Sequence, residues 1–221
     1  MRSFPLPLLV MVVACGDADK SVEEDTWDGG SGSDAGATTI CEGNRHYRSA
    51  VRDQCTEITE SLSIDAYTPG MGEYADITDL SELSRLTKIG TAFSIGGMDS
   101  LVDFSGLEKL VSIGSLQVEG MDALESFKGL ENLRSMDGWM EPEGHVGGIF
   151  LNNLPALNDI SALYGLTSFT DDTFRFTDTG VCLSEIMAFR DFLESIGGGP
   201  FEGSGETDGD VNPDLEGNPD C

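Results

Sequence analysis

Five cysteines are the residues of this chain whose chemistry is easiest to interpret. Cys15 directly follows an apolar N-terminal run, whereas Cys41, Cys55, Cys182 and Cys221 lie in the rest of the chain. Without Cys15 four cysteines remain, and an even number of cysteines in an exported chain predicts disulfide bonds. The sequence contains no C-x-x-C spacing, so a thiol redox site or a zinc site has little support. Four cysteines allow three pairings, and their presence alone does not choose among them.

The N-terminus has the features of an export signal. Arg2 precedes an apolar run over residues 4–13, and Ala14 and Cys15 follow it. This run is shorter than the roughly 20 apolar residues that span a bilayer, so we expect residues 1–14 to be a removed signal peptide. The alternatives are cleavage at another position, or a free Cys15 in a soluble secreted protein.

Residues 12–15, with the sequence Val-Val-Ala-Cys, resemble the lipobox of bacterial lipoproteins. In that family the cysteine is acylated and becomes the new N-terminus. The resemblance implies a covalent lipid on Cys15, with palmitate among its acyl chains, and anchoring to a membrane by lipid only. It also implies a location in the bacterial cell envelope, at the outer membrane or the cell surface.

The chain is strongly acidic, with 40 acidic and 12 basic residues and a formal charge of -28. Such a charge repels polyanions, so binding to nucleic acid, or to anionic lipid through a basic patch, is excluded as a function. Two acidic segments flank the middle of the chain. We expect residues 15–40 to be a Gly/Ser-rich flexible tether and residues 197–221 to be a Gly-rich tail, because neither can bury enough apolar surface to fold.

The acidic tail carries oxygen ligands at alternate positions, as calcium loops do: Asp208, Asp210, Asn212 and Asp214. It lacks the glycine at the sixth position and the glutamate at the twelfth that an EF-hand requires. A solvated acidic tail is therefore the preferred interpretation, with calcium binding as the weaker alternative. No other metal or cofactor is expected.

An internal repeat occupies the middle of the chain. Seven apolar positions recur in three successive coils. They are offset by 23 residues between the first two of these coils, and by 33 residues between the second and the third. Their spacing is two once and three thereafter, which does not fit a helix. Stacked coils would bury these positions in one continuous column. The seven positions are Phe93, Ile95, Met98, Leu101, Phe104, Leu107 and Leu110, then Leu116, Val118, Met121, Leu124, Phe127, Leu130 and Leu133, then Ile149, Leu151, Leu154, Leu157, Ile160, Leu163 and Leu166.

Residues 55–64, 106–110 and 129–133 resemble the repeats of the receptor L domain, a leucine-rich-repeat-like module. The resemblance covers residues 41–196. It implies a mainly β fold, a right-handed parallel β-solenoid of about five coils. Similar modules occur in bacterial surface lipoproteins of unassigned function and in ligand-binding ectodomains of growth-factor receptors, so the resemblance implies no particular ligand.

The repeat register favours one pairing of the cysteines. Cys55 falls where leucines close the other coils, and Cys182 falls where Leu101, Leu124 and Leu157 lie. Each would end the column at one pole, and each has a partner on the flank leading away, which favours Cys41 with Cys55 and Cys182 with Cys221. After Cys182, apolar residues at spacings of three and four predict a helix that ends at Gly197 and caps the solenoid.

The solvent-facing row of the strands contains two candidate binding residues. We expect Ser61, Ser63, Ser94, Ser115, Gln117, Phe150, Asn152, Arg175 and Thr177 to point away from the core. Phe150 is a large aromatic in this polar row, beside Gln117 and Arg175, which suggests contact with a partner. The alternative is that the insertion at residues 138–147 folds over Phe150 and covers it.

That insertion, Gly138 to Gly147, carries Trp139, Met140 and His145. Loops inserted into one coil of a solenoid often bind ligands, and this loop leaves the coil just before the strand that contains Phe150. We therefore expect the loop and the row to form one site. A second insertion, near residues 66–73, is the weaker candidate, and either insertion could be a tolerated surface loop.

Catalysis has little support, because the two histidines stand alone without a catalytic motif. We therefore expect no enzyme, but a membrane-tethered, extracytoplasmic recognition or adhesion module whose partner is a protein or a carbohydrate at the cell surface. The alternative is a structural envelope lipoprotein whose acidic tails bind calcium or act as spacers. The sequence gives no evidence for an oligomer.

Overall fold

The computed structural model describes residues 38–65, 77–141, 144–170, 173–199, 201, 215 and 217–221, with the backbone only at 139–141 and 144–146. These residues belong to one compact unit, Ala37–Cys221. The expected signal peptide, the lipidated Cys15, most of the tether and the four candidate calcium ligands lie outside the described residues, as does the second insertion at 66–73. The described part of the chain contains no helix that is long and apolar enough to cross a membrane.

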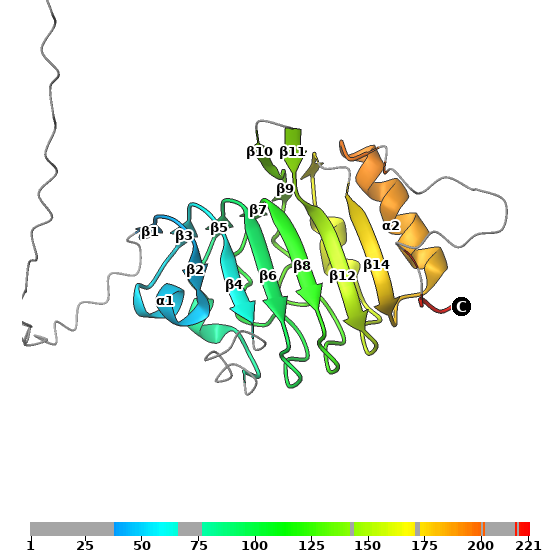
Figure 1. Cartoon of the computed structure of the whole chain (residues 1–221), viewed down its shortest axis with the longest axis horizontal. Helices are drawn as coiled ribbons and strands as arrows, with labels where there is room; N and C mark the ends of the chain where they lie inside the picture. Colours follow the sequence, from blue (N-terminus) through cyan, green and yellow to red (C-terminus); the bar gives the residue numbers. More distant parts are fainter. Residues whose placement is uncertain are drawn as a thin grey trace, which may run out of the picture. The chain divides into compact units, whose positions relative to one another are not determined.

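The fold is mainly β, with two parallel six-stranded sheets (Figure 1). The short-strand sheet has the order β1-β3-β5-β7-β9-β13, and the long-strand sheet has the order β14-β12-β8-β6-β4-β2. Apart from one two-stranded hairpin, consecutive strands along the chain alternate between the two sheets, which is the arrangement expected of a parallel solenoid. The short strands are β1 (Ile40–Cys41), β3 (Glu57–Ile58), β5 (Lys88–Ile89), β7 (Ser112–Ile113), β9 (Ser135–Met136) and β13 (Ser168–Phe169); the long-strand sheet contains β2 (Arg45–His46), β4 (Leu62–Asp65), β6 (Ala92–Gly96), β8 (Ser115–Glu119), β12 (Gly148–Leu154) and β14 (Phe174–Thr179).

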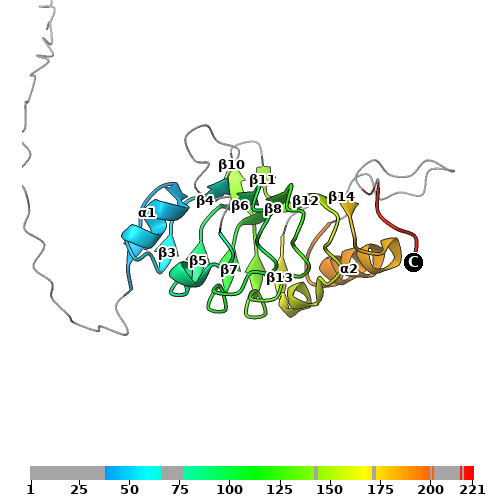
Figure 2. The same cartoon turned by 90° about the horizontal axis from the view of Figure 1, so that it is seen from below.

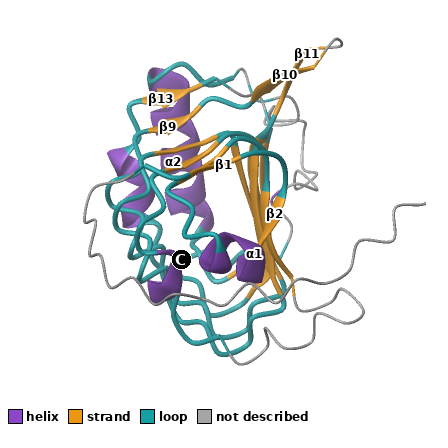
Figure 3. Ribbon diagram, turned by 90° about the vertical axis from the view of Figure 1, so that its left-hand side faces the viewer, coloured by secondary structure: helices purple, strands orange, loops and turns teal. Residues whose placement is uncertain are grey.

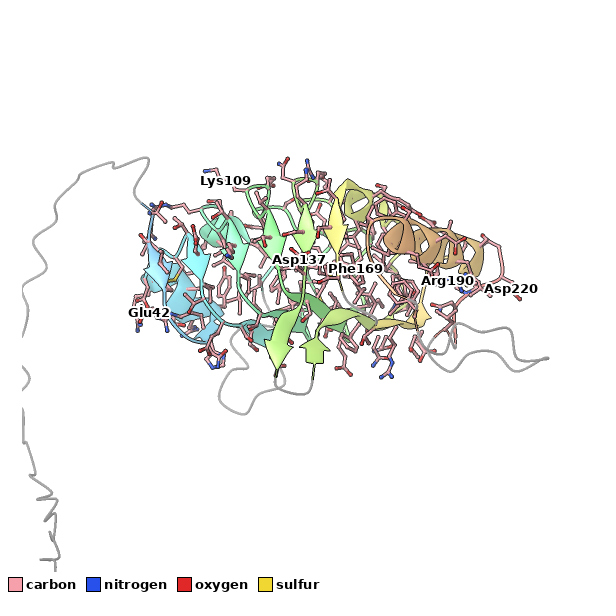
Figure 4. All side chains as sticks on the ribbon, turned by 90° about the horizontal axis from the view of Figure 1, so that it is seen from above. Glu42, Lys109, Asp137, Phe169, Arg190 and Asp220 are labelled. Atoms are coloured by element: carbon pink, nitrogen blue, oxygen red, sulfur yellow. A yellow bond between two sulfur atoms is a disulfide. The ribbon has the colours of Figure 1, made fainter. Side chains whose placement is uncertain are left out.

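The predicted apolar column is the core between the two sheets. Phe93 of β6 pairs with Leu116 of β8, and Leu116 pairs with Ile149 of β12, so the predicted offsets of 23 and 33 residues are the registers of the strands. All 21 ladder residues of the three coils are buried, none with more than 3% of its surface exposed. The prediction of the column is therefore confirmed, and Figure 4 shows its side chains filling the space between the sheets.

The corners that connect the coils are closed by repeated polar contacts. The backbone N–H of Ser105 donates to Asp103 Oδ1 at 2.8 Å, and the equivalent bonds at the preceding and later corners are Ser81 to Asp79 and Ser161 to Asp159, both at 2.9 Å. Two of these corners include short 3₁₀ helices, η1 (Ser81–Leu83) and η2 (Ser161–Gly165). The side chain of an aspartate thus replaces a backbone acceptor where the chain changes direction.

The N-terminal end of the stack is closed by a helix that the sequence did not predict, α1 (Tyr47–Arg52). Its buried residues, Tyr47 and Ala50, pack into the core, and the hydroxyl of Tyr47 donates to Glu82 Oε2 at 2.8 Å. A disulfide bond joins Cys41 to Cys55 across this helix. The ordered domain also begins earlier than expected. β1 starts at Ile40, within the predicted tether, because it pairs with β3.

The C-terminal end is covered by α2 (Leu183–Ser195), in the place where the sequence predicted a capping helix (Figure 1). Ile186, Phe189 and Leu193 are its buried residues. Cys182 is the N-cap of this helix and forms a disulfide bond with Cys221, so both disulfides are the pairs that the register favoured. Val181 is fully buried, whereas the adjacent Cys182 is only half-buried, so the last apolar position of the column belongs to Val181.

Part of the predicted acidic tail is in fact folded. Phe201 and Leu215 are buried in the core cluster. The Asn218 side chain bonds to β14, and the Pro219 carbonyl accepts a hydrogen bond from Leu183 N–H at 2.9 Å. The expectation of a solvated tail over residues 197–221 is therefore wrong for these positions. The tail is acidic on average, but its apolar residues Phe201 and Leu215 bury enough surface to hold parts of it against the domain.

The insertion at residues 138–147 forms an antiparallel hairpin, β10 (Trp139–Glu141) with β11 (Gly144–Val146). The hairpin begins at the edge where the long strands start, since Gly138 N–H donates to the Gly114 carbonyl at 2.9 Å. It leans outward, on the side of the long-strand sheet that faces away from the core (Figure 2). The hairpin runs directly into β12.

Candidate binding groove

The outer face of the long-strand sheet places the predicted row in register. Phe150 of β12 pairs with Gln117 of β8 on one side and with Arg175 of β14 on the other. Two residues further along the strands, Asn152 pairs with Glu119 and Thr177. These six residues alternate along their strands with the buried ladder residues, so their side chains point to the face turned away from the core.

A shallow groove of about 610 Å³ occupies this face. Its described lining comprises the six outer side chains together with Val118. A second hollow of about 140 Å³ lies next to it and shares Gln117 and Glu119 with the groove. The second hollow is also lined by Asp65, Ser94, Ile95 and Gly96. The concave surface therefore continues across the strands from β14 to β4.

Phe150 is half-buried and contributes its side chain to the groove. Its neighbours in β12, Ile149 and Leu151, are fully buried in the core, and strand alternation therefore turns Phe150 to the opposite face. Phe150 is therefore neither fully buried nor fully exposed, and part of its surface remains open in the groove beside the insertion. The phenyl ring lies one strand away from Arg175 and one strand away from Gln117.

Polar groups beside Phe150 are held by the sheet. Asn152 Nδ2 donates to Glu119 Oε1 at 3.0 Å, which joins the side chains of two adjacent strands. Arg175 also makes an interaction within the protein. The groove therefore contains amide, carboxylate, hydroxyl and guanidinium groups in fixed strand positions, around one aromatic ring.

Three aspartates at the coil corners have a pKa below the usual value of 3.8. Hydrogen bonds from Ser81 lower the pKa of Asp79, and hydrogen bonds from Ser161 lower the pKa of Asp159. At Asp103 partial burial raises the pKa, but hydrogen bonds from Ser105 and the ion pair with Lys128 lower it by more. These aspartates are structural, and their ionised form stabilises the corners.

The hairpin supplies the backbone next to the groove. Trp139 and Met140 belong to β10, and His145 belongs to β11. Met140 and His145 are directly paired across the hairpin. The backbone thus brings these residues to the edge of the long-strand sheet that contains Phe150 and Arg175 (Figures 1 and 3). Their participation in binding stays a prediction.

Two sequence-based assignments in the row need adjustment. Ser115, which we expected to face solvent, is fully buried, and its Oγ has no hydrogen-bond partner among the described residues. Gln117, which the sequence suggested as a mere neighbour of Phe150, lines both hollows. Glu119 was missed as a candidate. It could have been found by continuing the same register two residues beyond Gln117.

The described residues contain no cluster of three or more histidine, cysteine, aspartate or glutamate side chains that could hold a metal ion. The groove is instead suited to non-covalent contact, with one aromatic surface and several hydrogen-bonding groups. In comparisons with protein-family models, curated proteins and solved structures, none matched the chain.

Proposed function

We propose that this protein is a lipid-anchored, extracytoplasmic recognition or adhesion module of the bacterial envelope. In this proposal it performs no catalysis and binds its partner through the groove on the long-strand sheet. The lipid on Cys15 holds the domain at the outer membrane or the cell surface, and the acidic residues that follow act as a tether.

The observation that carries the proposal is the position of Phe150 beside Arg175 in an open groove. Aromatic and arginine side chains are the groups that most often anchor interfaces. Both project from strands whose backbones are fixed by parallel pairing on both sides of β12. A site on a rigid sheet loses little conformational entropy when it binds.

Two disulfide bonds support export from the cytoplasm, because disulfides form and persist in oxidising compartments. They close the two poles of the stack, where terminal repeats lack a neighbour.

We further propose that the coils are right-handed, about five in number, and similar to those of the receptor L domain. A strand that returns to a parallel neighbour in the same sheet through a crossover does so with right-handed geometry in about 98% of cases. The alternation of short and long strands along this chain requires such crossovers between every pair of coils.

Calcium-dependent structural spacing is the competing role, and its candidate ligands lie outside the described residues. A calcium titration of the full chain separates the two roles. The recognition role predicts no change in the melting temperature, whereas a large increase would support the structural role.

The anchoring part of the proposal is tested by fractionating bacteria that express the full chain. The parent should incorporate labelled palmitate and sediment with membranes. Cys15→Ser should lose both properties while keeping the same melting temperature, because the lipid is attached outside the folded domain. Equal palmitate incorporation by parent and variant would show that Cys15 is not the anchor.

The recognition part is tested by adding the detergent-solubilised full chain to intact bacterial cells and measuring retention. Phe150→Ala and Arg175→Ala should each reduce retention. Lys109→Ala is the matched control, because this exposed cation lies on the opposite side of the domain from the long-strand sheet (Figure 4). Reductions no greater than that of the control would place the site elsewhere.

A further inference from the structure

We infer that the groove binds an uncharged oligosaccharide, with Phe150 as the platform on which a sugar ring stacks. This inference rests on the proposed recognition function and names the chemical class of its ligand. It is carried by the shape of the groove, the side chains that line it and the balance of their charges.

The first argument is the half-buried aromatic ring in a row of polar side chains. One side of a pyranose ring presents C–H groups, which pack against the electron-rich face of an aromatic ring. Phe150 offers such a ring on an open sheet face, flanked by Gln117 and Arg175 rather than by other apolar side chains. A protein partner would more typically find a larger apolar patch at the centre of its contact area.

The second argument is the set of hydrogen-bonding groups around Phe150. Sugar hydroxyls both donate and accept, so they are matched by groups that also do both. Gln117 and Asn152 carry amides, and Thr177 carries a hydroxyl, and each of these groups contains a donor and an acceptor. The bond from Asn152 Nδ2 to Glu119 Oε1 orients the amide before any ligand arrives.

The third argument is charge. Within the described lining of the groove, Arg175 and Glu119 are the only charged side chains, so their formal charges cancel, and the adjoining hollow adds one negative charge, Asp65. The whole chain carries a formal charge of -28, which disfavours polyanions and favours cations in general. An uncharged ligand is neither attracted nor repelled by the net charge of the chain. Its recognition would therefore depend on the contacts made in this groove.

The fourth argument is extent. A volume of about 610 Å³ lies within the range of roughly 300 to 1,000 Å³ that is usual for small-molecule sites. The adjoining hollow of about 140 Å³ continues the surface over β6 and β4 through Gln117 and Glu119. A chain of sugars running across the strands would therefore occupy both hollows, with the stacked ring at Phe150.

The inference is tested by calorimetric titration of the detergent-solubilised full chain with defined oligosaccharides. The neutral probes are cello-, malto- and N-acetylchito-oligosaccharides; oligogalacturonate is the acidic probe and chitosan oligosaccharide the cationic one. We expect binding of at least one neutral probe and weaker or no binding of the charged probes. Longer neutral probes should bind more tightly than single sugars, because the surface spans two hollows.

Variants at Phe150 separate stacking from simple apolar contact. Phe150→Leu should weaken binding of the neutral probe by about tenfold, whereas Phe150→Trp should retain it, because indole also offers a stacking face. Asn152→Ala should weaken binding through loss of an oriented amide, and Lys109→Ala should leave it unchanged. Equal binding by parent and Phe150→Leu would overturn the stacking role.

The outcomes distinguish this inference from the function on which it rests. If the chain is retained on cells in a manner that depends on Phe150 but binds none of the neutral probes, the ligand class is wrong and the recognition role stands. Tighter binding of the acidic probe would overturn the claim that the ligand is uncharged. If the parent chain is not retained on cells and binds none of the oligosaccharides, the proposed function is wrong as well.

Discussion

The side chain of Asn218, near the C-terminus, accepts hydrogen bonds from both donors of Thr179 at the end of β14. Its Oδ1 accepts a hydrogen bond from the Thr179 backbone N–H at 3.1 Å and another from the hydroxyl at 2.6 Å. Its Nδ2 donates to the Phe176 carbonyl at 2.6 Å and to the Leu215 carbonyl at 2.7 Å. β14 is the edge strand of the long-strand sheet, so one side chain pairs backbone groups that a further coil would otherwise satisfy.

Asn218→Ala should therefore destabilise the domain by about 1 to 3 kcal/mol, because it leaves part-buried donors and acceptors of β14 without partners. The measurement is urea unfolding of the oxidised protein. Asn158→Ala is the matched control, since Asn158 is exposed and its side chain donates to the Ala156 carbonyl within its own turn, while its backbone bond to Glu125 is kept in the variant. A loss no larger than that of the control would mean that the tail does not stabilise the edge strand.

The two disulfides should contribute unequally to stability. The Cys41–Cys55 bond closes a sequence separation of 14 residues, and the Cys182–Cys221 bond closes a separation of 39. In the chain-entropy model these loops correspond to about 3 and about 4 kcal/mol, respectively. We expect Cys221→Ser to lower the free energy of unfolding more than Cys41→Ser does. Peptide mapping of the unreduced parent checks the pairing itself, and a Cys41–Cys182 linked peptide would contradict it.

The corner aspartates predict a pH dependence of stability. The folded-state pKa of Asp103 is lowered below its usual value of 3.8, so the ionised carboxylate favours the folded state. Its contribution is fully present above the unfolded pKa and is lost as the pH falls through the folded pKa. Asp103→Asn should therefore be destabilising at pH 7, and the difference from the parent should vanish once the pH has fallen below the folded-state pKa of Asp103.

Asp99→Asn is the control for this experiment, because Asp99 is an exposed carboxylate four residues away. Thermal melts of parent and both variants between neutral and acidic pH give the comparison. The effect of Asp99→Asn is subtracted from that of Asp103→Asn at each pH. This is needed because acid also relieves the self-repulsion of a chain with a charge of -28. A difference for Asp103→Asn that stays constant with pH would show that the carboxylate is not stabilising in its ionised form.

The sequence was sufficient to predict the column and its capping helix, because both depend on apolar periodicity. Phe93, Leu116 and Ile149 recur at fixed offsets, and their burial follows from the stacking of identical coils. By contrast, α1 has six residues and only Tyr47 and Ala50 are buried, which is too short a pattern to distinguish from a loop. The hairpin escaped prediction because residues 138–147 contain three glycines and no strict alternation.

The groove was predictable only in part. Strand alternation placed Phe150, Asn152, Arg175 and Thr177 on one face, but which outward positions form a hollow depends on how the sheet curves. Ser115 illustrates the difference. Alternation assigns it to the outer face, yet it is fully buried at the point where the hairpin leaves the coil. Burial of this kind is a tertiary effect that a repeat register does not contain.

At Gly129 the backbones of two neighbouring coils approach each other closely. This residue has a φ of +102°, and a Cβ added to it would overlap the Phe104 carbonyl of the preceding coil. Gly129→Ala should therefore destabilise the domain through two effects, the left-handed backbone and the steric clash. Gly43 separates them, because it has a φ of +79° but no atom within 4 Å of an added Cβ. Gly43→Ala should cost about 1 kcal/mol, and Gly129→Ala should cost more, since the coils must move apart. Chemical denaturation of both variants gives the two free energies, and equal losses would show that the stack yields to the extra methyl group without strain.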